Sequence, residues 1–327
     1  MKSYDTIIVG GGAAAYAAAI YGARYNLKVL LVEREFGGET ALAGKIENYP
    51  GFTAVDGFEL MQKMKEQAVG VGVQTVDGDV GLVKNEYHCF EIKIGGKIYQ
   101  GKTIILATGS EYRKLGLPRQ DELKGKGVHY CVTCDGPLFK GKVAGVVGGG
   151  DSAVKGADQL SEMGAEHVYL IVREDNINRA EPINRERLAK KKNVTVLYST
   201  EVKELIGKKF IDAARLSKPF QGKDIVELRG LFVAIGSVPR GELPKALGVK
   251  LDERNQIDVD PRTMKTSVDG VFAAGDVTNA SGSFKQIVTG AAQGAMAATS
   301  AYNDVQNHPN VCVLHAVPAA GLLGPGK

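Results

Sequence analysis

Two cysteines in the segment HYCVTCDGPLF, residues 129–139, have the spacing and the neighbours that thiol chemistry requires. Cys131 and Cys134 are separated by two residues, so both sulfurs lie on one face of a helical turn and can join as a disulfide. N–H groups at the start of such a turn favour the thiolate form of the first sulfur. Asp135 follows directly and is placed to exchange a proton with the pair.

A zinc site and a purely structural disulfide are the alternatives to a redox role for the cysteine pair. A zinc site needs four ligands, but Cys89 and Cys312 are isolated and His129 has no partner at zinc-finger spacing. A structural disulfide across so short a loop removes little chain entropy, and the cytosol would reduce it. We therefore interpret Cys131 and Cys134 as a redox-active disulfide, predict no metal site, and regard His129 as a strand residue without a catalytic role.

The segment DTIIVGGGAAAYAAAIYGA has the pattern of a dinucleotide-binding corner, in which an apolar strand runs through glycines into an alanine-rich helix. Gly10 makes the tight turn, Gly12 lets a pyrophosphate approach the backbone, and Ala15 keeps helix and strand close. The next strand, LKVLLVE, ends in Glu33, which is placed to accept the ribose hydroxyls. The first part of the chain is therefore predicted to bind a dinucleotide.

A second corner, KVAGVVGGGDSAVKGADQLSEMG, repeats this arrangement with Gly148, Gly150 and Ala153. The strand HVYLIV, residues 167–172, follows it. Two dinucleotides in one chain are typical of a flavoenzyme that accepts hydride from a nicotinamide. A degenerate duplicate that binds nothing stays open as the alternative, because the acid downstream of the second corner is misplaced.

Three further segments predict that the first corner holds a flavin: ENYPG at 47–51, TIILATG at 103–109 and GVFAAGDV at 270–277. The last strand delivers Asp276 to a turn, where a carboxylate suits a ribityl hydroxyl. The small-residue helix that follows begins near Gln286, and its N-terminus is expected to face the pyrimidine edge of an isoalloxazine.

Together these patterns predict an α/β fold with two Rossmann-like, three-layer ββα domains. The FAD-binding domain is expected to be discontinuous, over 1–113 and 243–327, and residues 114–242 form an inserted nicotinamide-type domain that carries the cysteine pair. The residues expected to hold FAD are Gly10, Gly12, Ala14, Ala15, Glu33, Arg34, Gly38, Thr40, Asn48, Ala107, Thr108, Gly109, Gly275, Asp276, Lys285, Gln286 and Ile287. Those expected around the second nucleotide are Gly148, Gly150, Asp151, Ser152, Arg173, Glu174, Arg179 and Gly236.

Composition limits the class of protein without identifying it. The 327 residues are 44% hydrophobic and 24% charged, with a net charge of +4, so no nucleic-acid partner is indicated. No stretch approaches the roughly 20 apolar residues that span a bilayer, and the first residues lead directly into a strand without a signal peptide. We expect a cytoplasmic protein without a membrane segment.

The order of the motifs resembles that of the low-molecular-weight thioredoxin reductases. The shared segments are the corner at 10–15, ENYPG, ATG at 107–109, CVTCDG at 131–136, GGGDSA at 148–153, AIGSVP at 234–239 and AAGDV at 273–277. The resemblance covers nearly the whole chain, and CVTCDG followed by GGGDSA is specific.

This resemblance implies FAD, a homodimer, and electrons that pass from a reductant to flavin, to the cysteine pair and on to thioredoxin or a similar protein. It implies that Cys134 faces the flavin, that Cys131 attacks the partner's disulfide, and that Asp135 is the acid/base. It also implies a rotation of the inserted domain, because the dithiol must leave the flavin to meet a protein.

The sequence departs from the family where NADPH-using members carry a His-Arg-Arg run. Here the run is VREDNINRA, with Arg173, Glu174 and Arg179, and Lys155-Gly156 replaces the usual acids of the glycine loop. Glu174 would repel a 2′-phosphate and suits the free ribose of NADH, so NADPH is disfavoured. Two alternatives stay open: NADPH bound through the two arginines, and a non-nicotinamide donor such as ferredoxin or a second flavin.

Two other questions concern the wider role of the chain. A flavin sensor that switches its disulfide without turnover is an alternative from another class, but no regulatory extension supports it. Cys89 is expected to be packed in a strand, and Cys312 is either a passive cysteine or a third redox thiol.

Overall fold

The computed structural model describes residues 2–86, 89–239, 242–282 and 284–309. The chain forms two compact units, Met1–Ser110 with Pro239–Lys327, and Glu111–Val238. The second unit is thus inserted into the first, and the expected boundaries after residues 113 and 242 lie three and four residues further along the chain. Where the chain passes between the units, strands β9 (Ser110–Tyr112) and β18 (Ser237–Pro239) pair with each other.

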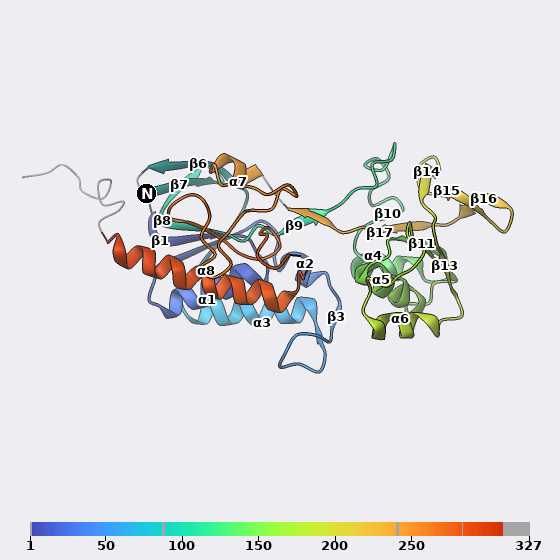
Figure 1. Ribbon diagram of the computed structural model, residues 1–327, viewed down its shortest axis with the longest axis horizontal. Coiled ribbons are helices and arrows are strands. Elements are labelled where there is room, and N and C mark those ends of the chain that lie inside the picture. Colours follow the sequence, from blue (N-terminus) through green and yellow to red (C-terminus); the bar gives the residue numbers. More distant parts are fainter. Residues whose placement is uncertain (1, 87–88, 240–241, 283, 310–327) are drawn as a thin grey trace, which may run out of the picture. The chain divides into compact units, whose positions relative to one another are not determined.

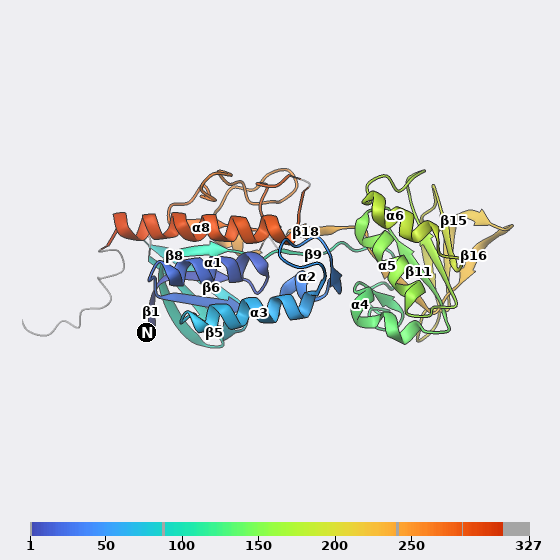
Figure 2. The ribbon, with the colours of Figure 1, turned by 90° about the horizontal axis from the view of Figure 1, so that it is seen from below.

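The first unit contains a sheet in the order β5-β2-β1-β8-β7-β6, with β19 also paired to β8 (Figure 1). The pairs among β5, β2, β1, β8 and β19 are parallel, whereas β6, β7 and β8 form an antiparallel meander. The helix α1 lies between α8 and α3 (Figure 2). The elements are β1 (Lys2–Val9), α1 (Ala13–Arg24), β2 (Val29–Glu33), α2 (Gly38–Ala41), β3 (Lys45–Ile46), β4 (Val55–Asp56), α3 (Gly57–Gly70), β5 (Gln74–Asp77), β6 (Val80–Glu86), β7 (Cys89–Ile94), β8 (Lys97–Leu106), α7 (Glu242–Ala246), β19 (Val271–Ala273) and α8 (Ile287–Asn307).

Small side chains bring α1 and α8 into close contact at the centre of this unit. The alanines of α1 are buried from Ala13 to Ala19, and on α8 Gly294 lies directly against the backbone of α1. A Cβ on Gly294 would meet the carbonyl oxygen of Ala14 at 2.1 Å. Because α1 begins at the first glycine corner and α8 begins at Ile287, this contact positions two helix starts that the predicted flavin site uses.

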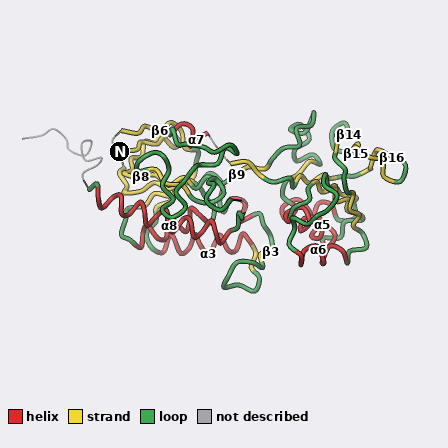
Figure 3. Tube along the Cα trace, in the orientation of Figure 1, coloured by secondary structure: helices red, strands yellow, loops and turns green. Residues whose placement is uncertain are grey.

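The second unit contains a parallel sheet in the order β10-β17-β11-β12-β13. It also contains a three-stranded antiparallel sheet, β14-β15-β16, whose strands are labelled in Figure 3. Its elements are β10 (Val128–His129), α4 (Val132–Asp135), the 3-10 helix η1 (Gly136–Phe139), β11 (Val143–Val147), α5 (Asp151–Glu162), β12 (His167–Ile171), α6 (Pro182–Ala189), β13 (Val194–Leu197), β14 (Val202–Ile206), β15 (Ala213–Phe220), β16 (Lys223–Glu227) and β17 (Gly230–Val233).

Alternating side chains of the parallel sheet separate this unit into two cores. Val146 and Phe232 face a cluster that includes Val154 and Leu160 of α5, whereas Val147 packs with residues of β14 and β15. Both faces of the sheet are therefore covered, which explains why its strands are continuous apolar runs. The predicted fold class, two Rossmann-like α/β units of which the first is discontinuous, is confirmed. None of the helices in the described part of the chain has the length and apolar character needed to cross a membrane.

The contact between α1 and α8 gives a prediction about stability. Gly294→Ala is expected to lower the free energy of unfolding by about 1–3 kcal/mol, because the added methyl group overlaps the carbonyl of Ala14. Gly70→Ala is the matched control, since this exposed glycine at the end of α3 has no atom within 4 Å of its added Cβ. That change is expected to be neutral or to stabilise by up to about 1 kcal/mol. Thermal unfolding measures both, and equal midpoints would contradict the packing argument.

Candidate functional site

The two central cysteines form a disulfide on a short helical turn of the second unit. Cys131 and Cys134 are bonded, with their Cα atoms 5.4 Å apart. Cys131 is the N-cap residue of α4, and its sulfur accepts a hydrogen bond from the backbone N–H of Cys134 at 3.1 Å. Cys134 is exposed and Cys131 is half-buried. The expected N–H donor to the first sulfur is therefore present, and Cys134 is the more exposed residue of the pair.

Three contacts that the sequence did not reveal hold this turn in place. Nδ1 of His129 lies 2.7 Å from Oδ2 of Asp135. Thr133, between the cysteines, exchanges hydrogen bonds with the side-chain amide of Gln159 on α5. A Cβ on Gly156 of α5 would lie 3.0 Å from Cγ2 of Val132, so a glycine at this position leaves room for the cysteine turn to pack against α5. Gly156 thus serves the disulfide turn, whereas the sequence suggested a change in the nucleotide loop.

The first glycine corner has the shape that a pyrophosphate requires. Gly10 has a φ of 143°, and its Cβ position lies 2.0 Å from the carbonyl oxygen of Ala107, so only glycine fits. At Gly12, by contrast, an added Cβ would have no atom within 4 Å. The hydroxyl oxygen of Thr108 is buried without a hydrogen-bond partner among the described residues. An open cradle at a helix start beside an unpartnered hydroxyl fits the predicted FAD.

The acid at the end of β2 lies deeper than expected. Glu33 is only 2% exposed, and its two oxygens accept hydrogen bonds from the hydroxyl of Tyr16 at 2.7 Å and from Nζ of Lys65 at 2.6 Å. Burial and then the bond to Glu33 raise the pKa of Tyr16, so its hydroxyl stays protonated and donates. Neither Tyr16 nor Lys65 was predicted. The neighbouring Arg34 forms an exposed ion pair with Asp79.

The residues predicted near the flavin ring also lie together in the first unit. Nδ2 of Asn48 donates to Oε1 of Gln286 at 3.1 Å, and Nζ of Lys285 donates to the carbonyl oxygen of Asp276. Burial raises the pKa of Asp276, although Lys285 opposes this shift. Burial also lowers the pKa of Lys285, whereas nearby carboxylates, of which Asp276 has the largest effect, act to raise it. The N–H of Gly275 is held by Gln293, a residue that the sequence did not single out.

The other predicted members of the first site surround the same corner. Gly38 and Thr40 lie in α2, and the Cβ position of Gly38 is 3.6 Å from Cα of Gly12. A Cβ on Gly275 would lie 3.0 Å from the methyl group of Ala14. The rest occupy the places expected of them: Ala15 in the first turn of α1, Gly109 in a left-handed turn after β8, and Ile287 at the start of α8.

The second glycine corner repeats the first in backbone geometry. Gly148 has a φ of 144°, and its Cβ position lies 2.2 Å from the carbonyl oxygen of Ala234. Gly150, like Gly12, has no atom within 4 Å of an added Cβ. The backbone of this corner is thus open to a phosphate group, as the first one is.

The side chains around the second corner differ from those of the first. Oε1 of Glu174 accepts hydrogen bonds from Arg179 at 3.0 Å and Arg173 at 3.2 Å, and Oε2 lies 3.4 Å from the Cβ position of Gly149. Burial acts to raise the pKa of Glu174, but hydrogen bonds and the two arginines leave it below its ordinary value. An ionised carboxylate therefore lies against the loop and occupies both arginines.

Asp151 joins the start of α5 to the start of α6. Its Oδ1 accepts hydrogen bonds from the backbone N–H of Glu181 at 3.0 Å and from Asn184 at 2.7 Å, and Lys155 lies 3.1 Å from Oδ2. Burial opposes ionisation of Asp151, yet these bonds leave its pKa below the ordinary value. Asp151 is thus a structural tie in this unit. Two other predicted members take no part in these bonds: Ser152 is exposed on α5 next to Asp151, and the carbonyl of Gly236 accepts the N–H of Arg113.

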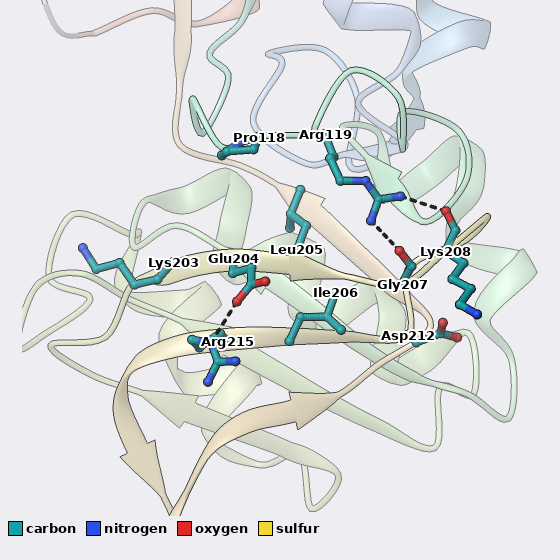
Figure 4. A pocket seen from close by; sticks show the side chains of 10 residues that line it. All are labelled: Pro118, Arg119, Lys203, Glu204, Leu205, Ile206, Gly207, Lys208, Asp212 and Arg215. Atoms are coloured by element: carbon teal, nitrogen blue, oxygen red, sulfur yellow. Dashed lines mark hydrogen bonds and ion pairs between the residues drawn. The ribbon is translucent and has the colours of Figure 1, made fainter.

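A separate cavity of about 790 Å³ lies on the β14–β15 side of the second unit (Figure 4). Its wall includes Arg119, whose guanidinium bonds the carbonyls of Gly207 and Lys208, and Arg215, which bonds Glu204. The guanidinium groups of Arg119 and Arg215 thus already form hydrogen bonds within this unit. The cavity contains none of the predicted site residues.

The chain matches known proteins along most of its length. The family model for pyridine nucleotide-disulphide oxidoreductases matches residues 4–294. A relative from Treponema pallidum (strain Nichols), named thioredoxin reductase, is 39% identical over 94% of this chain and 99% of its own length.

Solved structures agree with this sequence match. The thioredoxin reductase of Lactococcus lactis has a TM-score of 0.87 at 35% identity, covering 93% of this chain and 99% of its own. A ferredoxin-flavin thioredoxin reductase from Clostridium acetobutylicum has a TM-score of 0.50 at 30% identity, covering 94% of this chain and 99% of its own.

The two glycines of the first corner give a matched prediction. Gly12→Ala is expected to fold normally but to bind FAD about tenfold more weakly, because its methyl group fills the open cradle. Gly10→Ala is expected to fold poorly, since its methyl group overlaps the carbonyl of Ala107 and its φ disfavours a side chain. Reconstitution, followed by chromatography of the released flavin, measures the FAD content per chain. Wild-type FAD affinity in Gly12→Ala, or release of FMN, would contradict the assignment.

Proposed function

The chain belongs to the pyridine nucleotide-disulphide oxidoreductase family, and on this basis we propose that it is a thioredoxin reductase that reduces protein disulfides with its Cys131–Cys134 dithiol. The family resemblance seen in the sequence is confirmed by the matches to thioredoxin reductases along most of the chain. The observation that carries the activity is the disulfide on an accessible turn, directly before the second nucleotide corner.

Family membership implies FAD and a pyridine nucleotide. When bound and reduced by the donor, FAD would supply the two electrons that convert the Cys131–Cys134 disulfide to a dithiol. We assign the FAD site to the first unit, where Gly12 and Thr108 leave an open cradle and an unpartnered hydroxyl. Gln286 and Asp276 supply polar groups at the start of α8 and after β19.

The exchange with the partner needs no group beyond the side chains of the turn. The Cys131 thiolate attacks one sulfur of the thioredoxin disulfide, and the released thiolate takes up a proton. The thiol of Cys134 then loses its proton and attacks the Cys131 sulfur, which reforms the disulfide and releases the second thiol. Asp135 is the group that we assign to these proton transfers, because it follows Cys134 directly.

We further propose that the chain acts as a cytoplasmic homodimer with thioredoxin as its partner. The resemblance to low-molecular-weight thioredoxin reductases implies this assembly, and the relatives named thioredoxin reductase support thioredoxin as the partner. Light scattering of the purified holoprotein tests the dimer, and a mass of one chain would contradict it.

The electron donor is proposed to be NADH. Oε1 of the ionised Glu174, which lies against the glycine loop, accepts hydrogen bonds from both Arg173 and Arg179, so the carboxylate offsets part of the positive charge that a 2′-phosphate would meet and would itself repel the phosphate. A carboxylate at this position can accept hydrogen bonds from the free hydroxyls of a ribose. NADPH is therefore expected to be a poor reductant.

Ferredoxin is the second candidate donor. The observation in its favour is that Glu174 bonds both arginines and lies against Gly149 of the loop, where these side chains can hinder either nucleotide. A structural relative from Clostridium acetobutylicum carries the name ferredoxin-flavin thioredoxin reductase. Both donors leave the disulfide chemistry of the turn unchanged.

The assigned roles of the cysteines predict the behaviour of single variants. Cys131→Ser is expected to lose turnover with thioredoxin almost completely, whereas reduction of its flavin by the donor stays within about twofold of wild type. Electrons can then enter the protein but cannot leave by exchange. Cys134→Ser is the matched control, because its remaining Cys131 thiol is expected to release one equivalent of thiol from an aromatic disulfide. Thioredoxin reduction by Cys131→Ser would overturn the assignment.

The donor is tested by anaerobic stopped-flow bleaching of the flavin with NADH, NADPH and reduced ferredoxin. A loss of about 2–3 kcal/mol in binding the 2′-phosphate predicts a preference of some 30- to 150-fold for NADH over NADPH. Glu174→Arg is expected to shift this preference toward NADPH, whereas Glu227→Arg on the exposed strand β16 is a control for net charge. Faster reduction of wild type by NADPH would refute the charge argument, and bleaching by ferredoxin alone would select the second donor.

A further inference from the structure

We propose that His129 is a positioning residue that holds Asp135 for the proton transfers of thiol-disulfide exchange. This inference rests on the proposed function, since it concerns the same dithiol. The sequence placed His129 on a strand and gave it no chemical role. Its side chain, however, reaches the carboxylate assigned to the protons, at 2.7 Å between Nδ1 and Oδ2.

The bond joins a buried ring to a partly exposed carboxylate. The side chain of His129 is 6% exposed, whereas that of Asp135 is 37% exposed. Asp135 is the last residue of α4 and the N-cap residue of the 3-10 helix η1. The histidine therefore fastens one oxygen of the acid to the sheet and leaves the other oxygen available for a proton.

Aromatic packing fixes the orientation of the ring. His129 stacks on Phe232 with centroids 5.3 Å apart and planes at 30°, and it meets the edge of Phe139 at 5.2 Å. Phe232 is its registered neighbour on β17, so the sheet itself sets the position of the ring. A ring held on two sides cannot turn away from Asp135 without repacking the core.

Few charged side chains lie near the imidazole ring of His129 among the described residues. The strand β17 reads GLFV and η1 reads GPLF, so neither contributes a charged side chain. On α5, the side chain that contacts the cysteine turn through Thr133 is the neutral amide of Gln159. A cation, Lys142, lies 5.7 Å from the ring centroid of Phe139, on which His129 packs. Among the described residues that pack around His129, Asp135 is thus the charged side chain in direct contact with the imidazole.

This arrangement assigns the proton steps to a defined place. When the thiol of Cys134 becomes the attacking thiolate, its proton passes to the free oxygen of Asp135, and that proton then passes to the departing thiol of the partner. The pair of enzyme thiols becomes a disulfide and the partner's disulfide becomes two thiols, so electrons and protons balance. His129 carries no atom of the exchange and acts by keeping the carboxylate in reach.

Two substitutions separate positioning from packing. His129→Phe keeps an aromatic ring between Phe232 and Phe139 but loses the hydrogen bond. His129→Asn loses the ring but places an amide nitrogen at the distance of Nδ1 from the backbone, so the bond to Asp135 can reform. We expect His129→Phe to slow exchange with thioredoxin about 10- to 100-fold and His129→Asn to stay within about threefold of wild type. The opposite order would show that the ring serves only packing.

The pH dependence supplies a readout that packing alone does not move. Single-turnover oxidation of the reduced holoenzyme by thioredoxin is measured across pH for each variant. We expect the profile of His129→Phe to change in shape, because the carboxylate that takes part in the proton transfers is no longer held in reach of Cys134. A profile of unchanged shape and lower amplitude would overturn the inference. In the Asp135→Asn background, His129→Phe is expected to cause no further change, and an additive effect would also overturn it.

Controls distinguish this inference from the proposed function. His167→Phe, on β12, removes another strand histidine that bonds a neutral partner, Thr195 at 2.9 Å, and is expected to leave exchange unchanged. If His129→Phe does not fold, as judged by FAD content and thermal unfolding, His129→Leu tests the same loss of the bond. Wild-type protein that fails to reduce any protein disulfide would refute the proposed function, whereas active wild type with an equally active His129→Phe refutes only the role of His129.

Discussion

The approach of a carbonyl oxygen to a glycine at two strand ends is the contact on which both nucleotide corners depend. In each unit the oxygen occupies the place of a side chain, at Gly10 beside Ala107 and at Gly148 beside Ala234. The strand can therefore turn directly into the following helix, and the third glycine of each corner, Gly12 or Gly150, is left facing open space. The chain builds the same backbone shape twice, from sequences that otherwise differ.

Helix α5 connects the second corner to the disulfide turn within one rigid element. Its first residue, Asp151, ties the start of α6, and one turn later Gly156 makes room for Val132. Gln159, near its other end, bonds the threonine between the cysteines. The nucleotide corner and the redox turn thus share one helix, so a change that tilts α5 would disturb both. This shared support explains why the two motifs stand so close together in the sequence.

The features predicted from sequence are those whose geometry is determined within a few residues. The glycine corners, the cysteine pair and the two-unit α/β fold belong to this group. Partners far apart in the chain were not predicted, such as Lys65 for Glu33 and Asn184 for Asp151, because only packing of the whole unit brings them together. The contact between His129 and Asp135 was also not predicted, although they are only six residues apart. The alternation of side chains along a strand does not show which side chain a following irregular turn brings back to that strand.

Glu33 and Glu174, the acids beside the two glycine corners, differ in burial. This difference allows the choice of cofactor in one unit to vary independently of the other. Glu33 is buried and accepts hydrogen bonds from the buried Tyr16 and the partly exposed Lys65, so a change in its position would require the neighbouring core to repack. Glu174 is 33% exposed and bonds arginines of its own surface loop. Side chains at the surface exchange partners at small energetic cost, because water replaces a lost contact. Under the donor assignment that we propose, selection of the electron donor depends on a few exposed charges, and it can change while the proposed flavin site and the disulfide turn remain as they are.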